Sequence, residues 1–437
     1  MVVALACAAR ASAAGPGVRI PVERYVLPNG LVVVLHEDHH VPEVAVCVAY
    51  RVGSRDERKG RTGFAHLFEH LMFMGTRAVP SGELDRLIEA AGGDNNAQTS
   101  EDHTDYTDSG PSNLLERFLY LEADRMATLA DGITDEQLAL QVDVVRNERR
   151  ESYDNRPYGK LELALPGLLF GDGHPYQHPV IGSHEDLAAA RVGDVKAFFR
   201  EHYLPANAVL VVAGDFRSGE ARRMIARHFA RLAARPRPAR EPVAAAEPAP
   251  ARSVTIGGGV QLERVAIALH SAAAFAPGDA ETELLAAVLA TGLSSRLERA
   301  LVREGRVASE VAAEQRPLAA DGVLLVEATA APGRRAAEVE RALGAELDRL
   351  GREPPTEAEL ARARRLVAVE WLRKLERAPG RAELLADFEL ALGDAGLLEA
   401  QLLGRFAAVT TADVARQARR LAAAPRVVVR VIPGAGE

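Results

Sequence analysis

The sequence predicts an α+β fold built from two homologous α/β-roll-like domains, each a mixed sheet with helices packed on it. A Pro/Ala-rich break supports the division, because residues 232–252 hold repeated prolines among small residues and show no strand or helix period. A repeated unit supports the homology, because residues 194–214 and 413–432 both contain an Asp-started helix, a break with proline and a buried strand. In both halves, strand signals are grouped with helices instead of alternating strictly with them, which is typical of α+β domains.

The domain boundaries follow from these features. A chain of 437 residues is about right for two domains of roughly 200 residues each. We expect a possible targeting remnant at residues 1–18, a first domain at 19–231, a linker at 232–252 and a second, homologous domain at 253–437. Strands are predicted at 31–35, 44–50, 209–214, 260–269 and 427–432, and helices at 85–91, 111–126, 134–153, 281–291 and 336–350.

Composition and charge exclude several classes of protein. Hydrophobic residues make up 48% and charged residues 26% of the chain, which is the balance of a soluble globular protein. The formal net charge of −8 leaves no excess of positive charge for a phosphate backbone, so no nucleic-acid partner is expected. The chain has 2 cysteines, which excludes a disulfide framework, and Cys47 in the apolar run 44–50 is expected to fill the core.

The N-terminus bears on location. Val2 to Cys7, followed by Ala11-Ser12-Ala13, resembles the tail of a secretory signal with a small-residue cleavage site, although a basic leading region is missing. A periplasmic or secreted location is therefore expected, with an Ala-rich tail on a cytoplasmic protein as the alternative. No uninterrupted apolar run approaches the roughly 18 residues that a membrane span needs, so no integral membrane span is expected.

The strongest chemical signal is His66-Leu67-Phe68-Glu69-His70, in a helix expected between Gly63 and Gly75. At about 100° per residue, His66, Glu69 and His70 share one narrow arc, and apolar side chains fill the rest of the helix surface. Such a helix is buried, so its polar side chains need partners. Zn2+ is a suitable partner, because histidines at i and i+4 can bind one ion and Glu69 can then act as general base on a water. The alternative is a core helix whose histidines bond to the backbone.

A catalytic zinc needs a third protein ligand, and the helix over 134–153 offers one. A capping box of Thr134 with Gln137 marks its start. Glu148 lies about 60° from the buried stripe of this helix, and spacing alone leaves it open between a ligand and a surface glutamate. The other histidines of interest fit no ligand pattern and are expected to be solvated loop residues: His36, His39, His40, His174, His178 and His184.

With these motifs the chain resembles the pitrilysin-like, inverted-zincin metallopeptidases, and within them the bacterial branch similar to the mitochondrial processing peptidase. The resemblance extends over essentially the whole chain. It rests on Tyr25 to Leu31, Val52 to Glu57, His66 to Thr76, Asn95 to Ala97, Leu121 to Met126, Val144 to Arg150 and Gly292 to Leu297.

The resemblance implies a zinc-dependent endopeptidase that hydrolyses peptides or unfolded polypeptide segments. It makes Glu148, 78 residues after His70, the third ligand beside His66 and His70, with Glu69 as the general base. It also draws attention to Gln141, which stands where many relatives carry an acidic residue seven positions before the ligand, in a second layer around the metal.

The resemblance further implies how substrate binds. A peptide is expected to add a strand to a sheet edge near residues 95–99, with Asn96 and Ala97 as contact residues, inside a chamber that the second domain closes. Such edge pairing recognises the backbone, so a weak sequence preference is expected.

Two other classes stay open, a non-catalytic structural or binding subunit of such a peptidase complex and a metal storage or transport protein, in which Glu69 has no role. A partner is also expected. In relatives whose second half completes the site, that half carries an Arg and, seven residues later, a Tyr, and here Val302 and Ser309 match those positions. Neither can replace the missing donors, although a displaced match to Arg303 or Arg306 is the alternative. The resemblance therefore predicts a heterodimer with a homologous, non-catalytic subunit that lacks the zinc motif.

Overall fold

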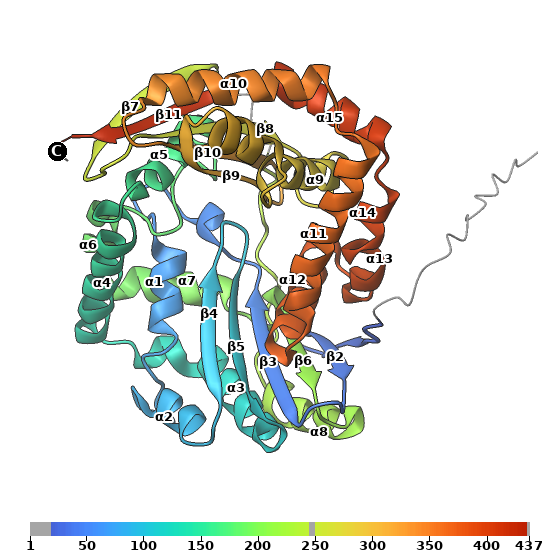
Figure 1. Ribbon diagram of the computed structural model, residues 1–437. Coiled ribbons are helices and arrows are strands. Elements are labelled where there is room, and N and C mark those ends of the chain that lie inside the picture. The colour runs from blue at the N-terminus through green and yellow to red at the C-terminus, as the bar shows by residue number, and fades with distance from the viewer. Residues whose placement is uncertain (1–18, 244–249, 435–437) are drawn as a thin grey trace, which may run out of the picture.

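The computed structural model describes residues 19–243 and 250–434, and each half of the chain forms one mixed sheet with helices packed on it (Figure 1). The leader-like residues at the N-terminus, including Cys7, lie outside the described residues. Among the described helices, none is long and apolar enough to cross a membrane. The predicted α+β architecture of two mixed sheets with helices is confirmed.

The first sheet has six strands in the order β1-β2-β6-β3-β5-β4. Their bounds are β1 Glu23–Val26, β2 Val32–Glu37, β3 Glu43–Tyr50, β4 Asp94–Thr99, β5 Thr104–Pro111 and β6 Ala208–Gly214. β2 and β6 are parallel, and all other neighbouring pairs are antiparallel. β4 is an edge strand, because it pairs with β5 alone.

The second sheet repeats this plan with five strands in the order β7-β11-β8-β10-β9. Their bounds are β7 Arg252–Gly258, β8 Arg264–Ser271, β9 Ala308–Pro317, β10 Gly322–Ala330 and β11 Val427–Pro433. The parallel pair β7 and β11 corresponds to β2 and β6, and the antiparallel strands follow in the same order in both sheets. The repeated unit seen in the sequence is α7 (Val192–His202) with β6 in one half and α15 (Thr411–Ala423) with β11 in the other.

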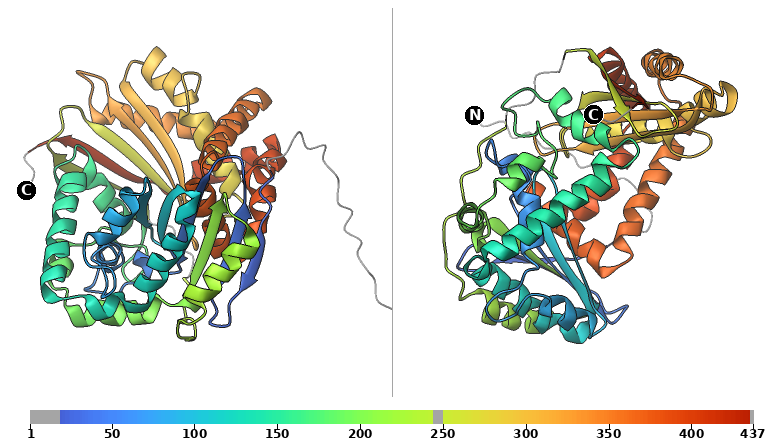
Figure 2. Two further views of the ribbon diagram at one scale, coloured as in Figure 1. Left: turned by 90° about the horizontal axis from the view of Figure 1, so that it is seen from below. Right: turned by 90° about the vertical axis from the view of Figure 1, so that its left-hand side faces the viewer.

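The remaining helices flank these sheets (Figure 2). In the first half they are α1 Phe64–Leu71, α2 Glu83–Glu89, α3 Leu115–Gly132, α4 Asp135–Arg149, α5 Gly159–Leu169, α6 His184–Ala188 and α8 Ser218–Phe229. In the second half they are α9 Asp279–Ala290, α10 Ala336–Arg352, α11 Glu357–Leu375, α12 Ala378–Leu392, α13 Leu398–Leu402 and α14 Gly404–Ala408.

Each half of the chain contributes one helix that packs on the sheet of the other half. α12 of the second half covers β3 and β6 of the first sheet, where Leu385 and Phe388 share a buried cluster with Cys47 (Figure 1). α5 of the first half covers β8 and β11 of the second sheet, where Leu165 shares a buried cluster with Val429. Both sheets are therefore buried on two faces, and separating the halves would expose both clusters to water.

Successive side chains of β3 point alternately into two different buried clusters. Val44 and Val46 point into the core of the first half, whereas Ala45, Cys47 and Ala49 point to the cluster under α12. Small side chains on that face leave room for a helix to approach the strand closely. Cys47 is fully buried there, which confirms its predicted place in the core.

Some predicted element boundaries are wrong. The helix predicted over 111–126 begins at Leu115, because Pro111 ends β5 and residues 112–114 form a 3-10 turn. The strand predicted over 260–269 begins only at Arg264, where pairing with β10 starts. The linker segment is also fastened to the first half, because Arg240 donates to both carboxylate oxygens of Asp56 at 2.9 and 2.7 Å.

Candidate metal centre

Helix α1 holds the polar residues of the motif in a buried setting. Gly63 at φ 86° and Gly75 at φ 83° bracket it in left-handed conformations that suit glycine. Gly63 has no side chain to cap the helix, and the buried carboxylate of Glu57 takes that role by accepting from the N–H groups of Gly63 (2.8 Å) and Ala65 (2.7 Å). The apolar residues of the helix are all buried: Phe64, Ala65, Leu67, Phe68 and Leu71.

Glu148 comes from the end of a second helix, α4. The predicted capping box starts this helix, because Thr134 Oγ1 accepts from the N–H of Gln137 and the Gln137 side chain accepts from the N–H of Thr134. The predicted apolar stripe is buried, and Glu148 lies on its flank with 38% of its side chain exposed. α4 packs against α1, so this flank faces the motif helix.

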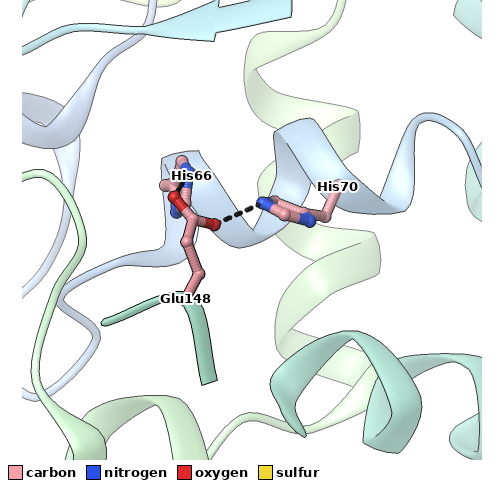
Figure 3. A group of neighbouring side chains, drawn as sticks. All are labelled: His66, His70 and Glu148. Atoms are coloured by element: carbon pink, nitrogen blue, oxygen red, sulfur yellow. Dashed lines mark ion pairs between the residues drawn. The ribbon is translucent and has the colours of Figure 1, made fainter. Parts of the chain in front are cut away.

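The side chains of His66, His70 and Glu148 converge on one point (Figure 3). His70 Nε2 lies 3.2 Å from Glu148 Oε2, and His66 Nε2 lies 3.7 Å from Glu148 Oε1. One donor atom of each residue lies within 4.8 Å of the other two, and no other group of three or more His, Cys, Asp or Glu in residues 19–243 and 250–434 does so. The structure therefore brings the three predicted ligands together from two helices.

The chemistry of this donor set fits a zinc ion. Burial lowers the pKa of His66 to about 4, against the opposing effect of the Glu148 charge, so the imidazole is neutral near pH 7. The hydrogen bond with His70 is the main cause that lowers the pKa of Glu148, which keeps this carboxylate ionised. Neutral imidazole and ionised carboxylate are the forms that bind zinc.

Glu69 lies on α1 but outside this group of donor atoms. Its Oε2 accepts a hydrogen bond from the hydroxyl of Thr99, at the end of the edge strand β4. Burial raises the pKa of Glu69, and the Thr99 hydroxyl opposes that shift. A carboxylate with a raised pKa beside a metal set is suited to accept a proton from water. Sequence reasoning placed Thr99 on the expected substrate edge but did not predict its hydrogen bond with Glu69.

The predicted substrate contacts lie on β4. Asn96 is exposed and Ala97 is half-buried, and both are paired on one side only, with β5. The opposite edge of β4 pairs with no described strand, and α1 contacts β4. An extended peptide could therefore pair with β4 next to the motif helix.

Gln141 is buried beneath the same region. Its Nε2 donates to Met74 Sδ at 3.0 Å, and among the described residues no hydrogen bond joins it to His66, His70 or Glu148. Gln141 thus ties α4 to the chain segment that follows α1. Any effect of Gln141 on the metal set passes through this packing.

A loop after α5 holds α1 and α4 relative to each other, and sequence reasoning did not find it. Gly182 lies directly against Gly63, since a Cβ on Gly182 would stand 2.4 Å from the Cα of Gly63. The Gly182 carbonyl accepts a hydrogen bond from Arg149, the residue after the Glu ligand. Asp186 accepts from the backbone N–H of Thr62 at 3.0 Å and from its hydroxyl at 2.6 Å. This loop therefore contacts both elements that carry the ligands.

The second half contributes charged groups beside Glu148. A cavity of about 530 Å³ is lined by Glu148 and by Arg264 and Arg316 of the second half. Arg316 is held by both oxygens of Glu162 at 2.7 and 3.2 Å. Arg264 forms an ion pair with Glu310 at 3.1 Å. Carboxylates therefore already neutralise both guanidinium groups.

Val302 and Ser309, which the family pattern aligns with an Arg and a Tyr, do not line this cavity. Val302 packs against the core of the second half. The Ser309 hydroxyl donates to the backbone carbonyls of Thr329 and Ala330 at 3.4 and 3.3 Å.

The histidines outside the motif are placed differently from one another. His39 and His40 are exposed, as predicted. The prediction is wrong for His36, which is 4% exposed, because β2 extends past it and buries its ring. The other three are half-buried and belong to no described metal-binding group: His174, His178 and His184.

Both halves of the chain match known protein families. Residues 32–166 match the family described as Insulinase (Peptidase family M16), and residues 190–367 match the one described as Peptidase M16 inactive domain. The first match contains all three residues of the metal set and Glu69. The second match, residues 190–367, begins near the end of the first half of the chain and covers much of the second half.

Relatives extend this similarity over most of the chain. The zinc protease PqqE of Helicobacter pylori is 31% identical over 386 residues, which cover 87% of this chain and 86% of that protein. The uncharacterized zinc protease SCO5738 of Streptomyces coelicolor is 27% identical over 412 residues, which cover 91% of this chain and 86% of that protein. The crystal structure of a protease from Helicobacter pylori matches with a TM-score of 0.86 and 28% identity, covering 95% of this chain and 100% of that one.

Replacing Glu148 tests the metal set. Glu148→Ala should lower zinc affinity by at least about 10-fold, because the variant keeps only the two imidazoles. Glu151→Ala is the matched control, since Glu151 is an exposed glutamate one turn further along. Zinc content after dialysis and affinity by chelator competition give the readout, and equal values in the two variants would place the third ligand elsewhere.

Adding one methyl group tests the loop after α5. In Gly182→Ala the new Cβ would lie 2.4 Å from backbone atoms of Gly63 and Thr62, so the loop must move away from α1. We expect zinc affinity to fall by roughly 10-fold, the effect of disturbing groups that orient ligands. Gly173→Ala is the control, because Gly173 has a similar φ of 85° but open space around it. Chelator competition should separate the two variants, and equal affinities would show that the loop does not position the ligands.

Proposed function

Because this chain belongs to peptidase family M16, we propose that it is a zinc-dependent endopeptidase that hydrolyses peptides or unfolded polypeptide segments. The observation that carries this proposal is the convergence of His66, His70 and Glu148 donor atoms within 4.8 Å. Two imidazoles and one carboxylate with an open fourth position are a ligand set that catalytic zinc uses. The relatives support the choice of metal, since both are named zinc proteases.

The chain's own residues divide the chemistry among them. His66, His70 and Glu148 would hold the ion, and zinc in such a site supplies a Lewis acid that polarises a carbonyl and makes water more acidic. Glu69 takes the proton from the attacking water and delivers it to the departing amine nitrogen. The Thr99 hydroxyl occupies one Glu69 oxygen, so proton transfer falls to the other.

Strand β4 binds the substrate in this proposal. Its unpaired edge lies beside α1, so a peptide added as a further strand passes next to Glu69. Asn96 and Ala97 are the contact residues on this edge. Backbone pairing supplies the affinity, and a broad range of sequences is therefore accepted.

A non-catalytic subunit is the second candidate function. The description of an inactive domain favours it for residues 190–367, which contain neither Glu69 nor any ligand. The first half keeps the complete set, which supports catalysis there. The two candidates differ in one respect, since only the peptidase requires Glu69 as a base.

We further propose that the active form is a heterodimer with a homologous subunit that lacks the zinc motif. The support is that the second half of this chain lacks the two substrate-binding side chains that the family pattern expects. Val302 and Ser309 stand at the positions of a substrate-binding Arg and Tyr and lie away from the cavity beside Glu148. Arg264 and Arg316 do line that cavity but are already paired with carboxylates. A second chain would then supply the groups that bind the substrate carbonyl.

Replacing the base tests the division of roles. Glu69→Gln should retain zinc at the wild-type level and lose peptide cleavage by about 10²-fold to 10⁴-fold, because the ligands stay and the proton acceptor is removed. His66→Ala should lose both zinc and cleavage. Zinc quantification and cleavage of an unstructured fluorogenic peptide library give the two readouts. Full activity in Glu69→Gln would refute the assignment of this base.

Activity with and without a partner tests the heterodimer. The chain purified alone should bind zinc and cleave peptides poorly, and adding the homologous subunit should raise the rate by roughly 10²-fold, the effect of restoring an oxyanion donor. Substituting the Arg and Tyr of that subunit should abolish the stimulation while leaving zinc bound. Full activity of the isolated chain, unchanged by the partner, would contradict the proposal.

A further inference from the structure

A second polar cavity lies away from the metal set, where the linker crosses the first half. It has a volume of about 290 Å³, and its lining includes Arg51 at the end of β3, His202 at the end of α7, and Arg237 and Arg240 of the linker. None of its lining residues lines the cavity beside Glu148. The metal centre therefore does not explain it.

Two of the lining residues are held in place by one amide. Asn207 Nδ2 donates to the backbone carbonyl of Arg51 at 3.2 Å and to that of His202 at 2.8 Å. The N–H of Arg51 in turn donates to the carbonyl of Asn207 at 2.9 Å. The side chains of Arg51 and His202 thus start from fixed backbone positions on two sides of the cavity.

The side chains of Arg51 and His202 have no hydrogen-bond or ion-pair partner among the described residues. The His202 residue is 9% exposed, and its ring contacts Phe198 at a centroid distance of 4.7 Å. Arg51 is half-buried. Neither side chain uses its donors on another described residue, so both can bind a group that enters the cavity.

The charges around the cavity are predominantly positive. Arg240 is paired with Asp56, and Arg51 and Arg237 have no ion-pair partner among the residues that the structure describes. Burial is the first cause that lowers the pKa of Arg51, and the charges of Arg237 and Arg240 act in the same direction. Glu389 is the carboxylate that opposes this effect, and it is already held by Arg24 at 2.8 Å. The cavity therefore combines a surplus of positive charge with unused donors.

We propose that this cavity binds a phosphate dianion, either free or as a phosphate monoester, through Arg51, Arg237 and His202. Guanidinium groups match the geometry of phosphate oxygens and bind them through paired N–H donors. Two unpaired arginines balance the charge of about −1.5 to −2 that a phosphate monoester carries near pH 7. The volume of 290 Å³ leaves room for an organic group on the phosphate.

The bound anion would connect two separate segments. Arg237 belongs to the linker, whereas Arg51 and His202 belong to the first half. Ligand binding therefore fastens the linker more tightly to the first half than the ion pair of Arg240 with Asp56 does alone. Because a ligand that binds the folded state stabilises it, thermal stability should rise with ligand concentration.

Phosphate binding to the full chain tests this proposal. Inorganic phosphate and glucose 6-phosphate are titrated in turn by calorimetry and by thermal denaturation, with sodium chloride at matched ionic strength as the salt control. Arg51→Gln and Arg237→Gln should each weaken binding by at least about 10-fold, because each removes a charged donor. Arg237 is exposed, so its variant keeps the fold even if Arg51→Gln does not.

Two controls make the result specific. Arg235→Gln should bind phosphate like the wild type, because this linker arginine donates to the carbonyl of Arg200 and does not line the cavity. His66→Ala should also retain binding, which separates this cavity from the metal centre. Tighter binding of inorganic phosphate would identify free phosphate as the ligand. Tighter binding of glucose 6-phosphate would identify a phosphate monoester. A stabilisation that sodium chloride reproduces, or equal binding in Arg237→Gln and the wild type, would overturn the proposal.

Discussion

The polar strip on helix α1 is the constraint on which the first half depends. The helix is surrounded by apolar core, so each polar group on it needs a partner or costs several kcal/mol. Each group finds its partner on a different element: the imidazoles face Glu148 on α4, Glu69 meets Thr99 on β4, and the helix start meets the carboxylate of Glu57. Elements far apart in sequence must therefore meet at one helix. The same packing brings the side chains of His66, His70 and Glu148 together and places the edge strand β4 beside α1.

Because α12 packs on the first sheet, the second half has a structural role that does not depend on any catalytic residue of its own. α12 covers the face of the first sheet opposite to the core that contains α1, and α5 covers the second sheet in return. Ala45, Cys47 and Ala49 are small where α12 approaches, so the strand sequence is already adapted to a helix that comes from the other half. Without the second half of this chain, this face of the first sheet would be exposed to water. The positions of α1 and β4 therefore depend on a domain that contributes no residue to the metal set.

The parts of this site that could be predicted from sequence are those encoded in local patterns. The arc of His66, Glu69 and His70 and the capping box before α4 are spacings within single helices, and both appear in the structure. The hairpin of β4 and β5 gave no such signal, because Asp94 to Thr99 is polar and lacks the alternation of a half-buried strand. The contact of Gly182 with Gly63 joins residues more than a hundred positions apart, and no periodicity encodes it. Family resemblance supplied Glu148, which spacing alone left open. It placed Thr99 on the substrate edge but not against Glu69, and it gave no role to the loop after α5.

The arginines that line the two cavities differ in their partners. Beside Glu148, Arg264 and Arg316 are each paired with a carboxylate, so a substrate carbonyl entering that cavity would have to compete with an existing ion pair. Such competition costs the energy of the pair and leaves a carboxylate unpaired in a partly buried place. At the linker, Arg51 and Arg237 have no such partner in the described part of the chain, so an anion that enters there breaks no described ion pair. The linker cavity therefore offers arginine donors that no described carboxylate holds, and the cavity beside Glu148 does not. The same residue type thus stabilises the interface between the halves in one cavity and is available to a ligand in the other.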